Sequence, residues 1–351
     1  MKRFAILLVL CSLAGCKQSV ERDTFLFPIH EENDRSAFRT LSPELVLSAP
    51  LNLSGYSVRG ETLITTADFM GEYCLEMYDL SSGDLIMQFC RKGRGPGEFL
   101  AVSPMFSESK GILSLYDAGT GNYSELDLSS DDTNILKSAR LSSPDGVSTP
   151  IIMSTFRLSD EKVLAYNSIQ GSPEFVSIDN PYYAVYDTSS GQEIRKYDLF
   201  DATALRESSP NQMVDLGIAD CLSNDRSRLC FALNGMPIVA FLDLESGKAS
   251  GVRVKGAPSN DPDAPMTFFS SVCSDQNYVY ALYYGKRWEE LIPGQINTML
   301  YIFDWDGNIL AKYSMDGLYN SCRMESGTLY LSKTDSDMLM RLYKLDSAVV
   351  Y

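Results

Sequence analysis

Short runs in which apolar and polar residues alternate recur along the chain, and each run ends in a cluster of turn residues. Alternation with a period of two is typical of β-strands that bury one face, and no long stretch shows the 3.6-residue period of an amphipathic helix. Six such runs precede a similar turn, at residues 62–66, 111–115, 162–166, 228–232, 278–282 and 327–331. The pattern predicts an all-β protein, in which the segment 213–222 is a strand or a short helix, the strand being favoured.

Each run leads into a hairpin with a common sequence, in which a strand ends in Asp and Gly follows a few residues later. Glycine takes the positive φ that a tight hairpin needs, and the Asp carboxylate accepts hydrogen bonds from the backbone of the turn. We therefore expect these aspartates to be structural and not catalytic or calcium-binding. The hairpins span residues 77–86, 115–123, 185–194, 241–248 and 302–310, with a shortened sixth at 342–347.

Six strands with six hairpins, repeated about every 40 to 70 residues, have the spacing of β-propeller blades. We predict a single domain, residues 41–351, folded as a six-bladed β-propeller. The segment 44–48 would pair into the last blade and close the ring, which removes the sheet edges that invite aggregation. A β-sandwich is the alternative, but it explains the turns and not the six repeats of one hairpin type.

The first residues have the pattern of an export signal. Lys2 and Arg3 supply a positive region, residues 4–10 supply an apolar run too short to span a bilayer, and residues 13–16 read Leu-Ala-Gly-Cys. Small residues before a cysteine resemble the bacterial lipoprotein box, in which the cysteine thiol is lipidated and becomes the first residue. We predict a signal peptide at residues 1–15 and lipidation of Cys16. An ordinary secretory signal with a chance cysteine is the alternative.

The polar segment after the cysteine is predicted to be a flexible tether, so that residues 16–40 join the lipid to the propeller. Docking of residues 25–27 on the domain is the alternative. Several acyl chains give stable membrane attachment. The expected location is therefore the bacterial cell envelope, on the periplasmic or the cell-surface face of the outer membrane.

Acidic residues outnumber basic ones, 46 against 30, and the net charge is −16. This charge disfavours nucleic acid and anionic lipid surfaces as partners. The lone histidine, His30, lies in the expected tether, which excludes most Ser-His-Asp, Cys-His and His-metal mechanisms within the domain. We predict no catalytic residue, no metal site and no cofactor, and a monomeric domain.

Six cysteines follow Cys11 and Cys16, and six cysteines allow fifteen pairings. Cys221 and Cys230 flank a turn at 223–227 and are expected to face each other on a hairpin. A disulfide between them is one reading, and buried thiols are the other. None of the six has the CxxC spacing of a metal or redox site.

The segment Arg91-Lys92-Gly93-Arg94-Gly95-Pro96-Gly97-Glu98-Phe99 holds three glycines, one proline and three cations. From Gly93 to Phe99 it resembles the G-x-G-P-G-E-F motif of the TolB-like, NHL-like six-bladed propeller lipoproteins of Gram-negative bacteria. The resemblance implies a crossing from the outer strand of one blade, residues 85–89, to the inner strand of the next, and it implies fold and location more than activity. Glycine amides beside cations can also hold an anion. The favoured alternative is a tight crossing in which Glu98 pairs with a local cation.

The loop at 284–297 is long for a connection within a blade, and Lys286, Arg287 and Trp288 make it the most site-like loop. Aromatic pairs at 182–183, 268–269 and 283–284 either contact a ligand or fill space between blades, and space-filling is favoured. Residues 260–263 and 304–308 offer oxygen ligands for calcium, with solvated turns as the favoured alternative.

These features together predict a lipoprotein of the cell envelope that acts as a non-catalytic binding or scaffold propeller. Its expected partners are the membrane, through the lipid, and a protein, a peptide or a glycan. The alternative is a propeller hydrolase or lyase that acts on an extracytoplasmic carbohydrate or lactone. That alternative requires several Asp, Glu or Asn side chains to converge in the central channel.

Overall fold

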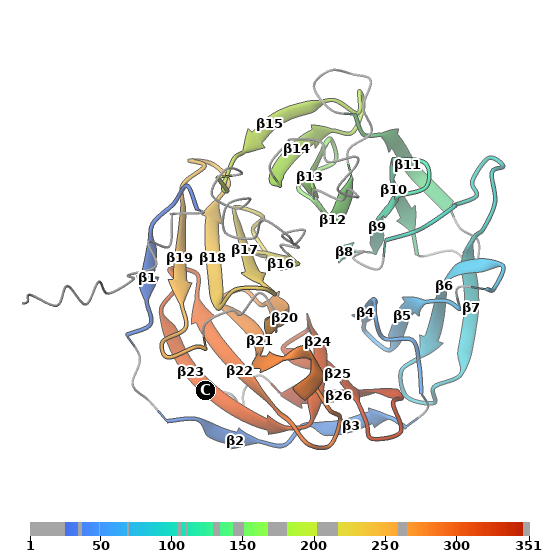
Figure 1. The fold of residues 1–351 in the computed structure, drawn as a ribbon. Coiled ribbons are helices and arrows are strands. Elements are labelled where there is room, and N and C mark those ends of the chain that lie inside the picture. The colour runs from blue at the N-terminus through green and yellow to red at the C-terminus, as the bar shows by residue number, and fades with distance from the viewer. Residues whose placement is uncertain are drawn as a thin grey trace, which may run out of the picture.

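The protein is a ring of six small β-sheets around a central axis, as the computed structural model shows (Figure 1). The model describes residues 25–33, 37–48, 50–68, 70–103, 107–109, 111–128, 134–142, 151–167, 181–201, 217–258 and 265–346. The predicted signal peptide and Cys16 lie outside these residues. The prediction of an all-β, six-bladed propeller is confirmed, and the β-sandwich alternative is wrong.

Each sheet is a blade whose strands follow one another from the axis outward. Blade 1 contains β4 (Tyr56–Arg59), β5 (Thr62–Thr66), β6 (Tyr73–Asp79) and β7 (Leu85–Arg91). Blade 2 contains β8 (Ser107–Ser109), β9 (Ile112–Asp117), β10 (Asn122–Asp127) and β11 (Asn134–Arg140). Blade 3 contains β12 (Ile152–Arg157), β13 (Lys162–Asn167), β14 (Tyr182–Asp187) and β15 (Glu193–Tyr197). Blade 4 contains β16 (Ile218–Leu222), β17 (Arg228–Leu233), β18 (Ile238–Asp243) and β19 (Ala249–Arg253). Blade 5 contains β20 (Met266–Ser274), β21 (Tyr278–Arg287), β22 (Asn297–Asp304) and β23 (Ile309–Asp316). Blade 6 contains β24 (Leu318–Glu325), β25 (Thr328–Thr334), β26 (Met340–Asp346) and β3 (Glu44–Leu47).

The ring is closed by an N-terminal strand in the last blade, as predicted. Strand β3 pairs antiparallel with β26, with Leu47 opposite Leu342 and Glu44 opposite Lys344. The first and last parts of the chain therefore share one sheet, and the ring does not open without breaking backbone hydrogen bonds.

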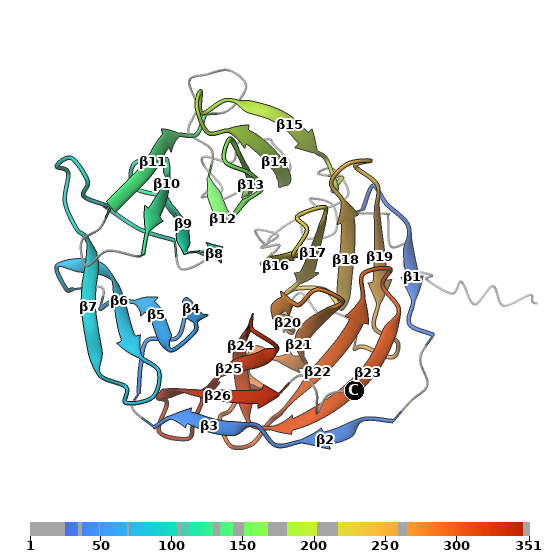
Figure 2. The same ribbon diagram turned by 180° about the vertical axis from the view of Figure 1, so that it is seen from behind.

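Two further N-terminal strands follow the outside of the ring (Figure 2). Strand β1 (Ile29–Glu31) adds in parallel to β19 of blade 4, and β2 (Arg39–Leu41) adds in parallel to β23 of blade 5. The prediction of a flexible tether up to residue 40 is therefore wrong for the described residues 25–33 and 37–40. Backbone pairing and burial hold this segment in place: Phe25 is 7% exposed and its ring packs against Phe200. We call residues 25–47 the N-terminal belt.

The hydrophobic core lies in the seams between adjacent blades. One of the two largest clusters in the described residues fills the seam between blades 3 and 4, where Tyr183, Phe200, Phe231 and Phe25 are in ring contact and are almost fully buried. The alternating strands supply one face to each neighbouring blade, so both faces of a blade are apolar near the axis. The predicted space-filling role of the aromatic pairs holds for Phe268, Phe269 and Tyr283, which pack between blades 4 and 5.

The predicted Asp turns join the third and fourth strands of blades 1, 3, 4 and 5. The carboxylates of Asp79, Asp187, Asp243 and Asp304 each accept hydrogen bonds from backbone N–H groups of the turn that follows. A glycine with positive φ completes each turn, such as Gly83 at 76°. In blade 6 the third strand also ends in Asp, at Asp346, and β3 takes the fourth position.

The hairpin predicted at 115–123 differs from the others. Asp117 ends β9, and its turn joins the second and third strands of blade 2, at the opposite end of the blade. The residue at the matching place is Asp127, which ends β10. One turn sequence serves both ends of a blade, because the turn chemistry depends on local backbone geometry and not on which two strands it joins.

One short helix occurs in the described residues, the 3-10 turn η1 (Trp288–Glu290). No helix in that part of the chain has the length and apolar character needed to cross a membrane.

Candidate functional site

The glycine-rich segment 93–99 leads from β7, the outer strand of blade 1, toward β8, the inner strand of blade 2. The amide of Gly93 donates to the Phe99 carbonyl at 3.0 Å, and the amide of Gly95 donates to Glu98 Oε2 at 2.7 Å. A Cβ on Gly93 would overlap the Glu98 carboxylate. The chain's own carboxylate thus occupies the place beside the glycine amides where an external anion would bind. The geometry favours the structural reading of this motif.

Asp117 holds the same crossing from the other side. Its carboxylate accepts hydrogen bonds from the amides of Leu100 (3.0 Å) and Ala101 (2.8 Å), as well as from its own turn at Gly119. The side chain is almost fully buried, at 1% exposure. The carboxylates of Glu98 and Asp117 together fix the step from blade 1 to blade 2.

A polar cluster lies near the axis, where inner strands of different blades approach one another. Asp220 of β16 is 6% exposed, and its Oδ2 accepts hydrogen bonds from Ser154 Oγ of β12 at 2.5 Å and from Tyr183 OH of β14 at 2.9 Å. Among the described residues no group donates to the second oxygen, Oδ1. Two hydroxyl groups of blade 3 therefore donate to one oxygen of this blade 4 carboxylate, and the other oxygen accepts no hydrogen bond from the described residues.

Charge at the axis comes from two sides of the ring. Burial raises the pKa of Asp220 to about 6, although the hydrogen bonds from Ser154 and Tyr183 and the charge of Arg323 oppose this rise. Arg323 belongs to β24 of blade 6, and it donates to the carbonyls of Tyr56 (3.0 Å) and Cys322 (2.7 Å). Its guanidinium lies 5.5 Å from the centre of the Tyr56 ring. One carboxylate of blade 4 and one guanidinium of blade 6 thus lie on inner strands, close enough for the cation to act on the acid.

The axial cluster has the chemistry of a single proton-binding group. Asp220 exchanges a proton near neutral pH, but two cooperating carboxylates are required for glycoside hydrolysis. The described side chains that act on Asp220 are Ser154, Tyr183 and Arg323, and none is a second carboxylate. In the described part of the chain no group of three or more His, Cys, Asp or Glu is placed to hold a metal ion. The arrangement gives no support to the hydrolase or lyase alternative.

Asp220 and Arg323 are not among the site residues predicted from the sequence. A signal for Asp220 was present: a carboxylate in the middle of the apolar strand Ile218–Leu222. A charged residue inside such a strand is either paired or neutralised once the strand is buried. Arg323 carried no comparable signal, since cations are common on strand surfaces.

The loop at 284–297 presents its predicted residues to solvent. Lys286 and Arg287 are exposed, and Trp288, at the start of η1, is 75% exposed. The loop is held in shape, because the Arg287 amide donates to Glu290 Oε2 at 2.9 Å and the Tyr284 hydroxyl donates to the Tyr319 carbonyl at 2.8 Å. The exposed indole therefore projects from an ordered support.

A second exposed apolar group lies on the neighbouring turn of blade 6. Met338 is 70% exposed and Leu339 is 41% exposed. The two loops are adjacent, since a Cβ on Gly294 would lie 3.9 Å from the Cβ of Ser336. Trp288 and Ile292, which is 44% exposed, lie on one of these adjacent loops, and Met338 and Leu339 lie on the other. We call these four exposed residues the recognition rim.

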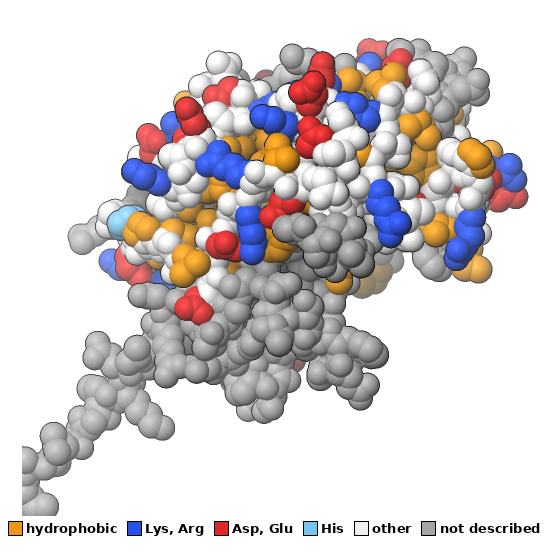
Figure 3. Space-filling model, turned by 90° about the horizontal axis from the view of Figure 1, so that it is seen from above, with side chains coloured by type: hydrophobic (Ala, Val, Ile, Leu, Met, Phe, Trp, Pro, Cys, Tyr) orange, Lys and Arg blue, Asp and Glu red, His pale blue; other side chains and the backbone are white. Residues whose placement is uncertain are grey.

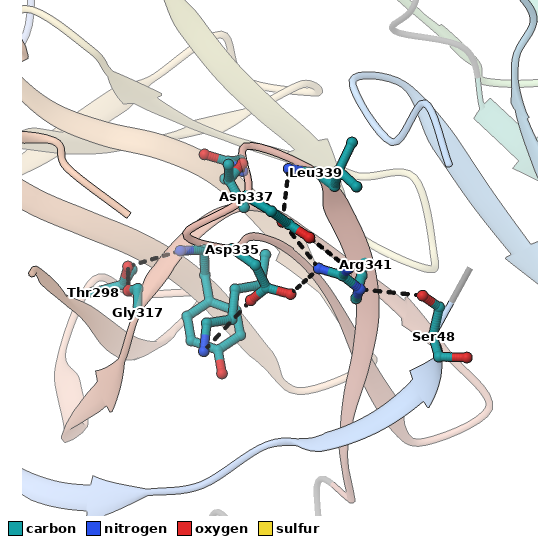
Figure 4. Close-up of polar contacts among 11 residues, drawn as sticks. Ser48, Thr298, Gly317, Asp335, Asp337, Leu339 and Arg341 are labelled. Atoms are coloured by element: carbon teal, nitrogen blue, oxygen red, sulfur yellow. Dashed lines mark hydrogen bonds and ion pairs between the residues drawn. The ribbon is translucent and has the colours of Figure 1, made fainter. Parts of the chain in front are cut away.

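Ion pairs fix the blade 6 side of the recognition rim (Figure 4). Arg341 binds the carboxylates of Asp335 and Asp337, the latter at 2.8 Å, and donates to the Ser48 carbonyl at 3.1 Å. The Leu339 amide in turn donates to Asp337 at 3.2 Å. Met338 and Leu339 are thus held on a turn that ion pairs and hydrogen bonds stabilise.

Charges of both signs are interspersed over the described part of the view in Figure 3, without a large area of one sign.

Two remaining predicted sites are resolved in part. Cys221 and Cys230 lie directly opposite each other on β16 and β17, as expected, but both are reduced in this structure. The Asp304 carboxylate accepts hydrogen bonds from the Asp306 and Asn308 amides within its turn, which favours the turn over a calcium loop. The other proposed calcium segment, 260–263, lies outside the described residues.

Comparisons with known proteins reveal fold similarity. No family model matches the chain, and no curated protein matches it. The fold is shared with two bacterial proteins of known structure. A member of the DUF4221 family from Bacteroides vulgatus ATCC 8482 superimposes with a TM-score of 0.58 at 12% identity, covering 91% of this chain and 94% of that one. A protein from Bacteroides fragilis NCTC 9343, described as exported, gives 0.52 at 11% identity, with coverages of 91% and 99%. At these identities the likeness establishes the propeller fold alone.

Proposed function

We propose that this protein is a lipid-anchored, non-catalytic binding propeller of the bacterial cell envelope, and that the recognition rim of blades 5 and 6 contacts its partner. The observation that carries the proposal is Trp288, which exposes 75% of its surface on a hydrogen-bonded 3-10 turn. Tryptophan is the side chain most enriched among residues that dominate binding energy. A rigid, exposed indole loses little conformational entropy when it binds.

The composition of the rim favours a protein or peptide as the partner. Met338, Leu339 and Ile292 add aliphatic surface around the indole, and Arg287, Glu289 and Asp337 surround it with charge. An apolar centre with a charged margin is the usual anatomy of a protein interface. A glycan would contact the indole face but gain little from the methionine.

The lipobox supports attachment to the membrane. The eight residues 17–24 separate Cys16 from Phe25, whose side chain is fixed against blade 4. Eight residues span at most about 30 Å when fully extended. A lipid on Cys16 would therefore hold the propeller close to the membrane surface, and the negative net charge would disfavour contact with anionic headgroups.

The recognition rim is tested by capture of partners from detergent-solubilised envelopes after chemical cross-linking. The full chain is compared with W288A and M338A, and with M70A as a matched control. Met70 is 86% exposed on the corresponding loop of blade 1. We expect both rim variants to lose the captured protein and M70A to keep it. Equal capture by all four proteins would contradict the proposal, and capture of a glycan in place of a protein would contradict the choice of partner.

Lipid anchoring is tested separately by metabolic labelling with an alkynyl fatty acid. The native chain should carry the label and partition into detergent, and C16S should be unlabelled and soluble. Labelling of C16S, or an unlabelled native chain, would contradict the anchor while leaving the rim experiment intact.

A further inference from the structure

The six described cysteines fall into three pairs, although the sequence allowed fifteen pairings. The clearest pair is Cys221 and Cys230, which are direct partners in the antiparallel register of β16 and β17. Both side chains also belong to one buried cluster. Directly opposed Cβ atoms on antiparallel strands lie about 4.5–5.5 Å apart, so a small approach of the two strands brings them to the roughly 3.5–4.5 Å that a disulfide needs.

The second pair is Cys74 and Cys90, on β6 and β7 of blade 1. In this register Tyr73 lies opposite Arg91 and Leu75 lies opposite Phe89, so the two cysteines face each other between these partners. Both side chains belong to the same buried cluster. The backbone of Cys90 is left-handed, with φ 58°, a conformation that only a specific local contact keeps in a non-glycine residue.

The third pair joins two blades. Cys273 lies on β20, the inner strand of blade 5, and Cys322 lies on β24, the inner strand of blade 6. Both side chains belong to one buried cluster, and Cys322 Sγ contacts the Oγ of Ser271, two residues before Cys273 on the same strand, at 3.5 Å. Cys221 belongs to a different buried cluster. The geometry therefore pairs Cys273 with Cys322.

We propose that the mature protein carries three disulfides, Cys74–Cys90, Cys221–Cys230 and Cys273–Cys322, introduced while the chain folds in an oxidising compartment. The proposal rests on export as set out under the proposed function. The oxidant is a small-molecule or protein disulfide. One cysteine thiolate attacks that disulfide to form a mixed disulfide, and the second thiolate then displaces the remaining thiol of the oxidant. Two protein thiols are oxidised, and one oxidant disulfide is reduced to two thiols.

Burial decides when the exchange occurs. The six side chains are at most 8% exposed in the folded ring, and three of them, Cys90, Cys230 and Cys322, are fully buried. Burial raises the pKa of the Cys90, Cys230 and Cys273 thiols, so these three hold little thiolate after folding. The pKa of Cys322 is lowered, because its polar contacts and the charge of Arg323 outweigh burial, but this side chain is inaccessible to an oxidant in the folded ring. Oxidation is then expected during folding and to be slow in the folded, reduced protein.

The three bonds would stabilise different parts of the ring. Cys74–Cys90 and Cys221–Cys230 each lie within one blade, across neighbouring strands. Cys273–Cys322 would join the inner strands of the two blades that carry the recognition rim, and it closes the longest loop of the three. In the loop-entropy description, the bond that closes the longest loop stabilises most.

The test uses the full chain with C11S and C16S, which leaves these six cysteines. The protein is unfolded in denaturant with reductant and refolded with a mixture of oxidised and reduced glutathione. It is then alkylated under denaturing conditions and digested without reduction, so that mass spectrometry identifies the linked peptides. We expect the three named pairs, no alkylated cysteine, and a loss of two hydrogens per pair. The double variants C74A/C90A, C221A/C230A and C273A/C322A should each lose one link and keep the other two.

Several results would overturn the proposal. Full alkylation of all six cysteines after refolding with oxidised glutathione would do so, and so would a Cys221–Cys273 link. A folded, reduced sample that oxidises as fast as the refolding sample would contradict the timing. Because refolding is independent of cellular location, these outcomes are separate from a failure of export. A cellular arm compares protein isolated from the envelope with protein retained in the cytoplasm by deletion of residues 1–15, and only the first should be oxidised.

Discussion

The two halves of the ring differ at their outer edges. The N-terminal belt pairs with the outer edges of blades 4 to 6. Strands β1 and β2 cover the fourth strands of blades 4 and 5, β19 and β23, and β3 is itself the fourth strand of blade 6, beside β26. In blades 1 to 3 the outer strands β7, β11 and β15 have no further strand beside them among the described residues. Large apolar side chains on those edges are about half exposed: Leu85, Ile86, Leu136 and Ile194.

The difference shows that a blade does not need a cover to be folded. Blades 1 to 3 have the same four-stranded order and the same Asp turns as the covered blades, apart from the displaced turn at Asp117. Cover on blades 4 to 6 instead ties the N-terminus to the ring and completes blade 6. The stability of this attachment depends on a few contacts, and we expect substitutions in them to have larger effects than substitutions in the uncovered half.

The largest effect is expected at Glu32 of the belt. Its carboxylate binds Lys312 Nζ at 2.9 Å and accepts from the Lys255 amide at 3.0 Å, with Glu32 and Lys312 both almost fully buried. E32A leaves a buried ammonium without its partner, which costs about 3–5 kcal/mol. Urea unfolding of the full chain measures the change.

Two controls sharpen this prediction. E31A, next to it in β1, removes a carboxylate that is mostly exposed and 3.9 Å from Arg253, so its effect should stay within about 0.5 kcal/mol. The double variant E32A/K312M removes both charges and should recover most of the loss. If E32A and the native protein have the same urea midpoint of unfolding, the belt is not held by this ion pair.

The next effect concerns the seam where the two halves meet, between blades 3 and 4. The folded pKa of Asp220, about 6, lies above the value of roughly 4 in an unfolded chain. The folded state therefore binds a proton more tightly, and the stability of the native protein should fall as the pH rises from about 4 through 6. D220N removes this dependence. The difference in unfolding free energy between D220N and the native protein should therefore shift in favour of D220N by roughly 3 kcal/mol from pH 4 to pH 8.

Unfolding free energies at several pH values, measured on native protein and D220N, test this sign. D160N provides a comparison, because Asp160 is a largely exposed carboxylate in the turn between β12 and β13 of blade 3. Parallel pH profiles for native protein and D220N would show that the buried carboxylate is not the proton-binding group.

A smaller effect is expected at the first crossing, in the uncovered half. G93A places a Cβ against the Glu98 carboxylate and should destabilise by about 1–3 kcal/mol, as overpacking commonly does. In G93A/E98A the obstructing carboxylate is gone, so the double variant should be less destabilised than the sum of the two single variants. Strict additivity in the urea midpoints would mean that the two residues do not interact.

The smallest effect is expected on the uncovered edges themselves. I86T and I194T replace half-exposed residues on β7 and β15, and each should change stability by less than about 0.5 kcal/mol. Their aggregation on prolonged incubation, followed by light scattering, should decrease, since apolar edge strands pair with other chains. A large loss of stability in either variant would show that these edges contribute to the core.

Much of the propeller could be predicted from sequence because its signals are local. The six alternating runs became β5, β9, β13, β17, β21 and β25, and the favoured strand at 213–222 is β16 in its described part. Ring closure by residues 44–47 followed from counting strands. The belt gave no such signal, since β1 and β2 are three residues long and join the sheets in parallel without a hairpin. Their pairing depends on burial of Phe25 and Glu32 against distant blades.

The sequence by itself determined the strands, the Asp–Gly turns and the number of blades, because alternation and turn chemistry act between residues a few positions apart. Tertiary structure decided which carboxylate lies at the axis, which cysteines face each other, and that the Glu98 carboxylate accepts a hydrogen bond from the Gly95 amide. It also decided that the N-terminal segment is a belt and not a tether. These outcomes depend on contacts between residues far apart in the chain, and a local pattern carries no record of them.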